Sequence, residues 1–372
     1  MPVLERLTLT DFRSYPALSW QPGSRIAIIT GPNGSGKTNV LEALSLLSPG
    51  RGLRGARMAD LARIDGSGRW AAAARFGGAA EQGGFTLGTG TLGDGPADRR
   101  TWRLDGAPVR SHSEVATAFT AIWITPQMDS LFQESASGRR RFLDRLVWAL
   151  DPGHARQAAC YDHAMAERNR LLAARQSDDA WLAGLEASMA RHAVALAASR
   201  SDFVARINVA PVPAASFPRA VLSLVDPIAD RLAGEPALAV EDWLRSTLAA
   251  ARERDAAAGA ALTGAHRADL AMNDAATGTP ASLASTGQRK ALLIGIILAQ
   301  AALVAESRAL PPALLLDEPM VHLDRARRAD LLAALARIPG TILVTGTDRD
   351  SFSPAPGEAA FWRAGNGQLE RD

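Results

Sequence analysis

The chain has 372 residues, a hydrophobic share of 47%, and 41 lysines and arginines against 39 acidic residues, which gives a formal net charge of +2. This balance excludes a uniformly basic nucleic-acid binder and leaves only local clusters of arginine as candidate nucleic-acid contacts. The length suffices for a substantial core. The lone cysteine, Cys160, excludes an internal disulfide and a cysteine zinc hook.

A glycine-rich segment near the N-terminus has the spacing of a phosphate-binding loop (P-loop). Residues 31–38 match G-x-x-x-x-G-K-[ST] at every fixed position. The apolar run 26–29 predicts a buried strand before the loop, and 39–47 predicts a helix after it. Such a loop directs backbone N–H groups and a helix N-terminus at one phosphate. The predicted ATP-binding residues are Gly31, Pro32, Asn33, Gly34, Ser35, Gly36, Lys37, Thr38 and Asn39.

Within the loop, Lys37 is predicted to reach the β- and γ-phosphates, and the Thr38 hydroxyl is predicted to ligate Mg²⁺. Arginine replaces lysine almost everywhere in this chain, and Lys37 and Lys290 are its two lysines. A compact ammonium suits a phosphate cradle better than a planar guanidinium. For Lys290 we expect an exposed helix lysine, with a specific role as the alternative.

The middle of the chain predicts an antiparallel sheet and then helices. Short strands are expected at 69–76, 84–92 and 100–104, followed by a hairpin turn at Asp105-Gly106. Gln127 follows the apolar run 123–125 and is predicted to link the γ-phosphate and Mg²⁺ to the helical lobe. Residues 139–262 have helical spacing, interrupted by prolines between 211 and 227.

Two later segments carry further motifs. Ser285, Thr286, Gly287 and Gln288 form a Ser-x-Gly-Gln signature. The apolar run 314–316 predicts a strand that ends in Asp317-Glu318. Asp317 is expected to hold Mg²⁺, usually through water, and Glu318 to polarise the attacking water. Asp324, a short distance beyond, is predicted to reach across a dimer.

The stretches beside these motifs add two expectations. Residues 291–304 are the most apolar stretch, contain Gln300 and are too short to span a bilayer, so a buried helix is expected. Residues 342–345 predict a strand, and Thr347, or alternatively Thr345, is the candidate switch residue. A threonine there donates one hydrogen bond and carries no charge, which is consistent with slow hydrolysis.

The P-loop, the signature and the Asp-Glu-Pro segment resemble those of the ABC-type ATPases. Within that group the chain resembles the RecF family of DNA replication and repair proteins, with further similarity at 7–15, 48–54, 139–144 and 264–270. In the last of these, Ala265 and Ala268 replace a proline and an acid, so we assign it no catalytic role. The segment between Gln127 and Ser285 is longer than the corresponding insertion in transporter ATPases and shorter than the coiled coil of SMC proteins.

The resemblance implies an α/β fold: an ABC-type ATPase head with a P-loop sheet, an antiparallel β subdomain and an inserted helical arm lobe. The head would comprise 1–138 and 263–372, and the arm 139–262. ATP and Mg²⁺ are the implied cofactors, and two heads would sandwich two ATP molecules, each P-loop facing the other subunit's signature.

The implied activity is a weak, DNA-stimulated ATPase that acts in recombinational repair with the RecO and RecR mediators and helps to load the recombinase. The implied DNA is duplex or a gap junction, and its candidate contacts are Arg51, Arg54, Arg139, Arg140 and Arg141. A cytoplasmic location without a membrane partner is expected, because no leader pattern opens the sequence.

Two alternatives remain. A transport-coupling ATPase is disfavoured by the long arm and by the lack of a switch histidine. A clamp that binds ATP without hydrolysing it is disfavoured by the intact Lys37, Asp317 and Glu318.

Overall fold

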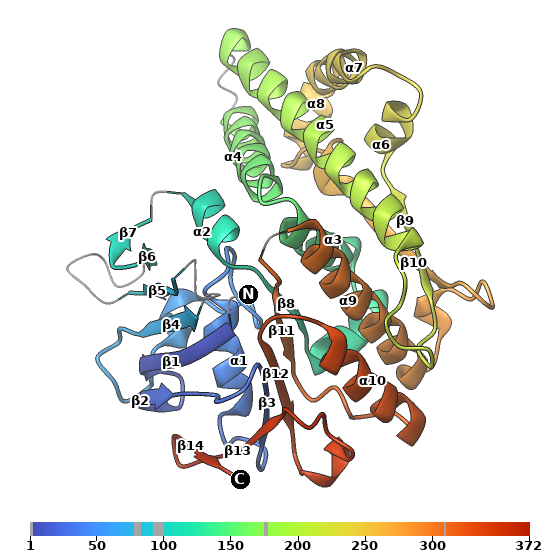
Figure 1. Ribbon diagram of the computed structural model, residues 1–372. Helices are drawn as coiled ribbons and strands as arrows, with labels where there is room; N and C mark the ends of the chain where they lie inside the picture. The colour runs from blue at the N-terminus through green and yellow to red at the C-terminus, as the bar shows by residue number, and fades with distance from the viewer. Residues whose placement is uncertain (1–2, 78–82, 92–99, 110, 175–177, 309) are drawn as a thin grey trace. The chain divides into compact units, whose positions relative to one another are not determined.

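The computed structural model describes residues 3–77, 83–91, 100–109, 111–174, 178–308 and 310–372 (Figure 1). The chain forms two compact units. The first comprises Met1–Asp129, Ala210–Arg219 and Leu283–Asp372, and the second comprises Ser130–Val209 and Ala220–Ser282. Residues 130–138 and 263–282 therefore group with the second unit, although the sequence analysis assigned them to the head. Residues 210–219, which it assigned to the arm, group with the first unit.

A six-stranded sheet in the first unit carries the P-loop. Its strand order is β14-β13-β3-β12-β11-β8, with β14 antiparallel to β13 and the other neighbours parallel. Strands β3, β8, β11 and β12 are buried along their whole length, as expected of parallel strands covered on both faces. The strands are β3 (Ile26–Thr30), β8 (Ala121–Ile124), β11 (Ala313–Leu316), β12 (Ile342–Gly346), β13 (Ala360–Gly365) and β14 (Gln368–Arg371).

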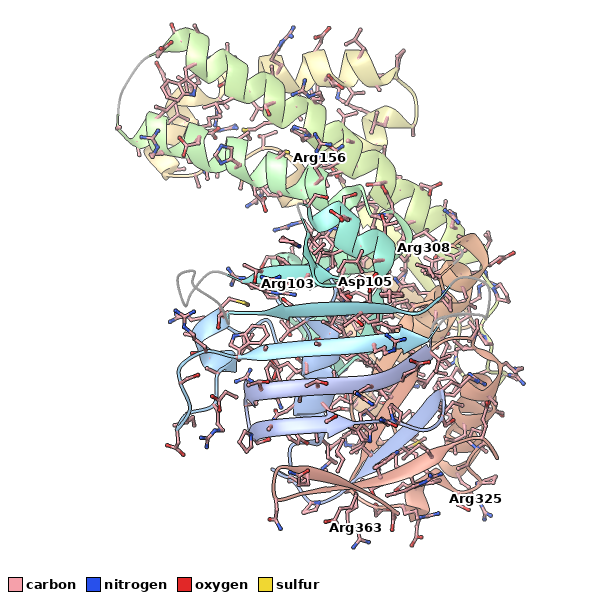
Figure 2. All side chains as sticks on the ribbon, turned by 60° about the vertical axis from the view of Figure 1, so that its left-hand side comes forward. Arg103, Asp105, Arg156, Arg308, Arg325 and Arg363 are labelled. Atoms are coloured by element: carbon pink, nitrogen blue, oxygen red, sulfur yellow. The ribbon has the colours of Figure 1, made fainter. Side chains whose placement is uncertain are left out.

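The first unit also contains a six-stranded antiparallel sheet of order β2-β1-β4-β5-β6-β7. Its strands are β1 (Val3–Phe12), β2 (Tyr15–Trp20), β4 (Ala71–Gly77), β5 (Phe85–Gly90), β6 (Thr101–Leu104) and β7 (Ala107–Pro108). The β6–β7 hairpin turns at Asp105 and Gly106, whose φ angles of 49° and 81° are those of the expected tight turn. Figure 2 labels Arg103 and Asp105 at this hairpin, and the Arg103 side chain closes it by donating to Gly106 O at 3.0 Å. Residue 92, where the second expected strand ends, lies outside the described residues.

Helix α1 (Lys37–Ser45) contacts both sheets of the first unit, including β1 and β4 on one side and β8, β11 and β12 on the other. The unit's other helical segments are α2 (His112–Ala118), α9 (Thr286–Ser307), α10 (Arg325–Arg337) and the 3-10 turns Met58–Leu61 and Asp350–Phe352. Among the described residues, α9 alone is long and apolar enough to cross a membrane, and 72% of its most apolar window is buried inside the protein. The expected helix at 291–304 is therefore a buried core helix, longer than its apolar stretch.

The second unit is mainly helical. Helix α5 packs along α4 and α7 over a core that includes Met189, Ala193, Leu244 and Leu248. A buried ion cluster lies beside this core, where Arg168 bonds Glu186 at 3.0 Å and Asp255 at 2.8 Å. The helices are α3 (Ala136–Leu150), α4 (His154–Ala173), α5 (Asp179–Val209), α6 (Pro227–Leu232), α7 (Ala237–Ala250) and α8 (Arg252–Ala258). A two-stranded antiparallel sheet joins β9 (Ala220–Val225) to β10 (Asp269–Asp274), and Ala265–Arg267 is a 3-10 turn. The 3-10 turns Pro126–Gln133 and Ala281–Leu283 each include residues of both units.

Candidate nucleotide-binding site

The P-loop joins β3 to α1, and two of its glycines are required by their surroundings. Gly31 and Gly36 have φ angles of 147° and 97°, which side chains rarely adopt. A Cβ on Gly31 would lie 2.7 Å from Ala364 O, and one on Gly36 would lie 2.8 Å from Ser14 Oγ. The Tyr15 hydroxyl also donates to Gly36 O at 3.2 Å. The loop is therefore held by the β1–β2 turn and by β13.

The Lys37 ammonium is folded back onto the loop and is buried. Its Nζ donates to Gly31 O at 2.7 Å and Pro32 O at 2.9 Å, and it lies 3.9 Å from Glu318 Oε1. Burial lowers the pKa of Lys37, and the nearby carboxylates of Glu318 and Asp317 oppose that shift. A bound phosphate would accept the hydrogen bonds that Lys37 Nζ donates to the loop carbonyls.

Asp317 and Thr38 meet as the proposed Mg²⁺ site requires. Thr38 Oγ1 donates to Asp317 Oδ1 at 2.9 Å, although the two residues lie 279 positions apart. Both offer hard oxygen ligands, which suit Mg²⁺. The described residues contain no cluster of three or more histidine, cysteine, aspartate or glutamate side chains that could hold a metal. A Mg²⁺ ion here would therefore be completed by phosphate oxygens and water.

The strand ends bring the remaining catalytic candidates to the same edge of the sheet. Gln127 follows β8, which pairs in parallel with β11, and Asp317 N donates to Ile124 O at 3.0 Å. Gln127 is exposed in the turn after β8, beside the strand that ends in Asp317. Carboxyl ends of parallel strands are the usual position of ligand-binding residues in such sheets.

The structure distinguishes between the two switch candidates. Thr345 is fully buried on β12, where its hydroxyl donates to Asp317 Oδ1 at 2.7 Å and accepts from Glu318 N at 3.0 Å. The Thr347 hydroxyl is exposed and donates to Asp348 Oδ2 at 3.1 Å. Thr345, the alternative candidate of the sequence analysis, is therefore the threonine that contacts the Asp317 carboxylate and the Glu318 backbone.

Lys290 is not the exposed helix lysine that the sequence analysis expected, and that prediction is wrong. It is 2% exposed, and its Nζ donates to the Glu318 carbonyl oxygen at 3.0 Å. Asp129 Oδ2 lies 3.8 Å from the same ammonium. Burial lowers the pKa of Lys290, and the carboxylates of Asp129, Glu318 and Asp317 oppose the shift.

The signature segment begins helix α9 through a capping box. The Ser285 hydroxyl accepts from Gln288 N at 3.3 Å, and the Gln288 side chain accepts from Ser285 N at 3.0 Å. Asp324 similarly caps α10 by accepting from Arg327 N at 2.9 Å, with its side chain 59% exposed. Ser285 and Asp324 are therefore placed locally by their caps while they remain open to solvent.

A buried carboxylate that the sequence analysis missed contacts Arg54, one of the two candidate DNA contacts of the first unit. Glu42 on α1 is fully buried, and Arg13 binds it through two hydrogen bonds of 2.9 and 2.8 Å. Arg54 donates to Glu42 Oε2 at 3.1 Å and to the P-loop residue Asn39 at 2.8 Å. Arg51 is exposed. Arg54 therefore already serves the P-loop helix, whereas Arg51 faces solvent.

The candidate DNA contacts of the second unit are unequal. Arg139 forms a bidentate ion pair with Asp269, with hydrogen bonds of 2.8 and 2.7 Å that lower the pKa of that carboxyl. Arg140 donates to Ala268 O at 3.1 Å. Arg141 is exposed on α3. The first two arginines thus stabilise this unit, and the third is the one that faces solvent.

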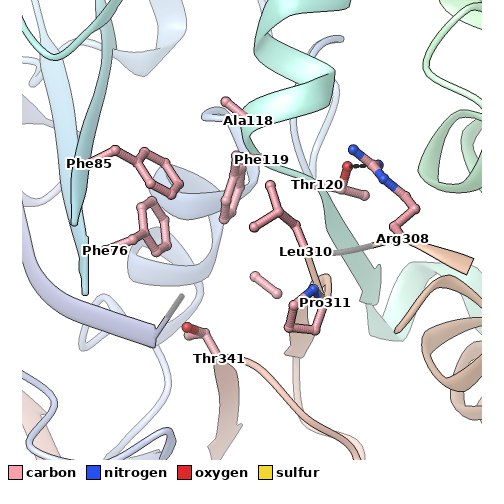
Figure 3. Close-up of a pocket in the computed structure, with 10 residues that line it drawn as sticks. Phe76, Phe85, Ala118, Phe119, Thr120, Arg308, Leu310, Pro311 and Thr341 are labelled. Carbon is pink, nitrogen blue, oxygen red and sulfur yellow. Dashed lines mark hydrogen bonds between the residues drawn. The ribbon is translucent and has the colours of Figure 1, made fainter. Parts of the chain in front are cut away.

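A small pocket of about 10 Å³ lies elsewhere in the first unit (Figure 3). The aromatic rings of Phe76, Phe85 and Phe119 line one side, and Arg308 on the other side donates to Thr120 Oγ1 at 2.6 Å. It has room for about one water molecule. Its lining contains no P-loop residue, so it is separate from the nucleotide site.

The parallel strands present a P-loop and a buried carboxylate at one edge, and an antiparallel sheet lies on the other side of α1. This arrangement defines a P-loop ATPase head. The chain belongs to the RecF/RecN/SMC N-terminal domain family, which matches residues 3–355. It is 44% identical to the DNA replication and repair protein RecF of Mesorhizobium japonicum, over 98% of this chain and 97% of that protein. The RecF protein of Agrobacterium fabrum is 43% identical over 98% of both chains.

Solved structures confirm the fold class. The recombination mediator protein RecF of the RecFOR pathway, solved with ATP, has a TM-score of 0.85 at 19% identity, covering 100% of this chain and 98% of that one. An Smc head domain from Pyrococcus furiosus has a TM-score of 0.56 at 16% identity, covering 100% of this chain and 96% of that one. The family and the α/β fold predicted from the sequence are both confirmed.

Proposed function

We propose that this protein is an ATP-binding and ATP-hydrolysing DNA repair protein that acts in replication and recombination as its RecF relatives are named to do. The observation that carries the proposal is the convergence of Thr38 on Asp317 at 2.9 Å and of Lys37 on Glu318 at 3.9 Å. These four side chains are those that a P-loop ATPase needs around the β- and γ-phosphates.

Each residue has a separate part in hydrolysis. The P-loop N–H groups and Lys37 would bind the phosphates, and Thr38, Asp317 and Gln127 would hold Mg²⁺. Glu318 accepts a hydrogen bond from the attacking water, and Thr345 orients the Asp317 carboxylate and the Glu318 backbone. Neither Thr345 nor Thr347 carries a charge that would stabilise the γ-phosphate at the switch position, so we expect slow turnover.

The active form is a homodimer that ATP brings together. Ser285, Thr286, Gly287 and Gln288 of one subunit would contact the γ-phosphate held by the other, with Asp324 at the junction. Supporting this, Ser285 and Asp324 lie at exposed helix starts. N–H groups at a helix start can bind an anion.

The dimer would bind duplex DNA or gap junctions, and hydrolysis would release it. RecO and RecR are the proposed partners, by analogy with the relative that was solved as a mediator of the RecFOR pathway. The proposed role is to help load the recombinase in the cytoplasm.

A test of this function compares the wild type with Glu318→Gln. The substitution keeps the shape of the side chain and removes the carboxylate that polarises water, so ATP binding should persist while turnover falls on the order of 100-fold or more. An ATP-bound dimer should accumulate, and it should be retained on gapped or duplex DNA. Sizing, ATP binding and phosphate release with duplex, gapped and single-stranded DNA measure these effects.

Lys37→Ala is the matched control, because losing the ammonium removes the main counter-charge of the β- and γ-phosphates. This variant should neither bind ATP nor dimerise. If Glu318→Gln hydrolyses ATP at the wild-type rate, Glu318 does not position the water. If the wild type binds ATP and DNA without any phosphate release, the protein is a non-hydrolysing clamp.

A further inference from the structure

Lys290 is a buried cation that the proposed hydrolysis mechanism does not use. It lies in the second turn of α9, directly after the capped signature segment, and is 2% exposed. Burying a long, strongly hydrated ammonium is unfavourable unless its donors find partners. The hydrogen-bond partners of the Lys290 ammonium therefore indicate why a lysine is buried at this position.

The main partner is the backbone of the turn that follows β11. Lys290 Nζ donates to Glu318 O at 3.0 Å, and the same oxygen also faces Val321 N at 3.5 Å. Glu318 has a φ of 47°, the left-handed conformation that non-glycine residues adopt at a cost of about 1 kcal/mol or more. The Lys290 ammonium therefore holds the strained residue whose side chain is proposed to polarise water.

A second contact joins α9 to the same turn. A Cβ placed on Gly287 would lie 3.3 Å from His322 O, so the first turn of α9 is packed against the other end of the turn. His322 also has a left-handed φ, of 65°. Helix α9 thus touches both left-handed residues of the 318–322 turn through their carbonyl groups.

We infer that Lys290 is a positioning residue that ties the signature helix to the Glu318 turn of the same subunit, so that engagement of the signature by a nucleotide sets the position of Glu318. This inference rests on the proposed dimeric ATPase. In that dimer, the signature serves the partner's nucleotide, whereas Glu318 serves the subunit's own. Lys290 would therefore couple the two ATP sites.

Helix α9 is rigid enough for this coupling. Its first residues are fixed by the capping box between Ser285 and Gln288, and its following turns are buried in the core. A small displacement at the signature is therefore carried along the helix to Lys290 rather than absorbed between them.

The decisive variant is Lys290→Met, which keeps the length of the side chain and removes its donors. We expect ATP affinity of the free subunit to stay within about twofold, because Lys37 and Thr38 are unchanged. Turnover should fall on the order of 10- to 100-fold, the loss expected when a reacting group is displaced by about 1 Å. The Hill coefficient for ATP should fall to about 1, because the sites no longer communicate. Ile297→Met, fully buried on the same helix, is the control for repacking.

Lys290 also lies 3.8 Å from Asp129, so a purely charge-neutralising role must be separated from positioning. The double variant Lys290→Met with Asp129→Asn removes the charge pair together and should recover stability if Lys290→Met is poorly folded. Its turnover should remain low. Recovery of both stability and turnover would show that Lys290 only neutralises Asp129, and the inference would be wrong.

Mixed dimers test the direction of coupling. With Glu318→Gln on one subunit and Lys290→Met on the other, the one remaining site uses the Glu318 of the Lys290→Met subunit and should be slow. With both substitutions on the same subunit, that site uses an intact Lys290–Glu318 pair and should hydrolyse near the rate of a Glu318→Gln/wild-type dimer.

Equal rates in the two mixed dimers would overturn the inference while leaving the proposed function intact. A wild-type protein that hydrolyses ATP as a monomer would instead overturn the proposed dimer, and the coupling with it. The comparison of wild-type assembly with the mixed-dimer rates therefore distinguishes the two failures.

Discussion

At the scale of single residues, the candidate site contains a buried hydroxyl group that two partners share. The Thr345 hydroxyl donates to Asp317 and accepts from the Glu318 N–H group. Such a residue fixes both the direction of the carboxylate that is proposed to hold Mg²⁺ and the backbone of the residue that is proposed to polarise water. Its contribution exceeds what a single neutral hydrogen bond would give.

Thr345→Val should therefore impair both stability and turnover. It leaves a buried N–H group and a carboxylate oxygen without their shared partner, a cost of about 1–3 kcal/mol. Turnover should fall about tenfold or more, because Asp317 and Glu318 lose their orientation. Urea unfolding and phosphate release measure the two effects. Thr347→Val, at an exposed position, is the matched control, and a larger loss of turnover in this control than in Thr345→Val would contradict the assignment.

His266 gives a pH dependence that belongs to the second unit. Its Nε2 bonds Ala261 O at 2.9 Å and its Nδ1 bonds the Tyr161 hydroxyl at 2.7 Å, so the neutral ring satisfies both partners, with Nε2 protonated. Burial lowers the pKa of His266. The folded state therefore binds this proton less readily than the unfolded chain, whose histidine titrates near about 6.5.

The stability from this histidine should be fully present above pH ~6.5 and lost as the pH falls through the folded-state pKa. Histidine ring titration by NMR should place His266 below the unfolded value. Unfolding of the second unit should become easier as the pH falls below about 6.5, and His266→Gln should reduce that slope. A ring pKa above 6.5 would contradict the expected sign.

At the scale of secondary-structure elements, helix α9 combines three features that the sequence presents separately. It begins at a capping box, it is buried along its apolar stretch, and it carries Lys290 to the Glu318 turn. The cap explains, from local contacts, why the helix begins directly after Ser285. A local role for Ser285 is therefore compatible with a second role across a dimer.

The two roles of Ser285 can be separated by substitution. Ser285→Arg removes the cap, at a cost of about 1 kcal/mol, and places a bulky cation at the exposed helix start. Ser285→Asp keeps a good cap but adds a negative charge facing the partner's γ-phosphate. Both variants should bind ATP through Lys37 yet remain monomeric. Sizing with ATP measures this, and normal dimerisation of both variants would leave Ser285 with the cap alone.

At the scale of the whole molecule, the charge balance makes individual arginines decisive for the proposed DNA binding. The net charge of +2 attracts DNA only weakly, so binding would depend on arginines whose guanidinium groups can reach the DNA phosphates. Arg139 is committed to Asp269, whereas Arg51 and Arg141 are exposed. Substituting all the clustered arginines together would mix structural and DNA-binding effects.

Arg51→Ala with Arg141→Ala should therefore weaken duplex binding and reduce the slope of log affinity against log salt by about one to two, at about 0.9 per phosphate contact. Arg139→Met should instead destabilise the second unit and leave the salt slope unchanged. Duplex binding at several salt concentrations tests both variants. A lower slope in Arg139→Met alone would show that this ion pair opens to reach DNA.

The sequence by itself determined the P-loop, the β6–β7 turn, the apolar stretch of α9 and the family. Each depends on residues close together in the chain, where glycine positions and apolar runs fix the local backbone. The positive φ angles of Gly31, Gly36 and Gly106 are the physical reason that those positions could be recognised in advance.

Tertiary structure alone decided which side chains the site uses and which arginines are free. Four contacts join segments that are distant in sequence. They are those of Lys290 with Glu318, of Thr345 with Asp317, of Arg13 with Glu42 and of Arg139 with Asp269. The separation of 130 residues between Arg139 and Asp269 shows why, since no local pattern encodes that contact. A charged or polar residue has the same sequence pattern whether it faces solvent or a buried partner, and only folding selects between them.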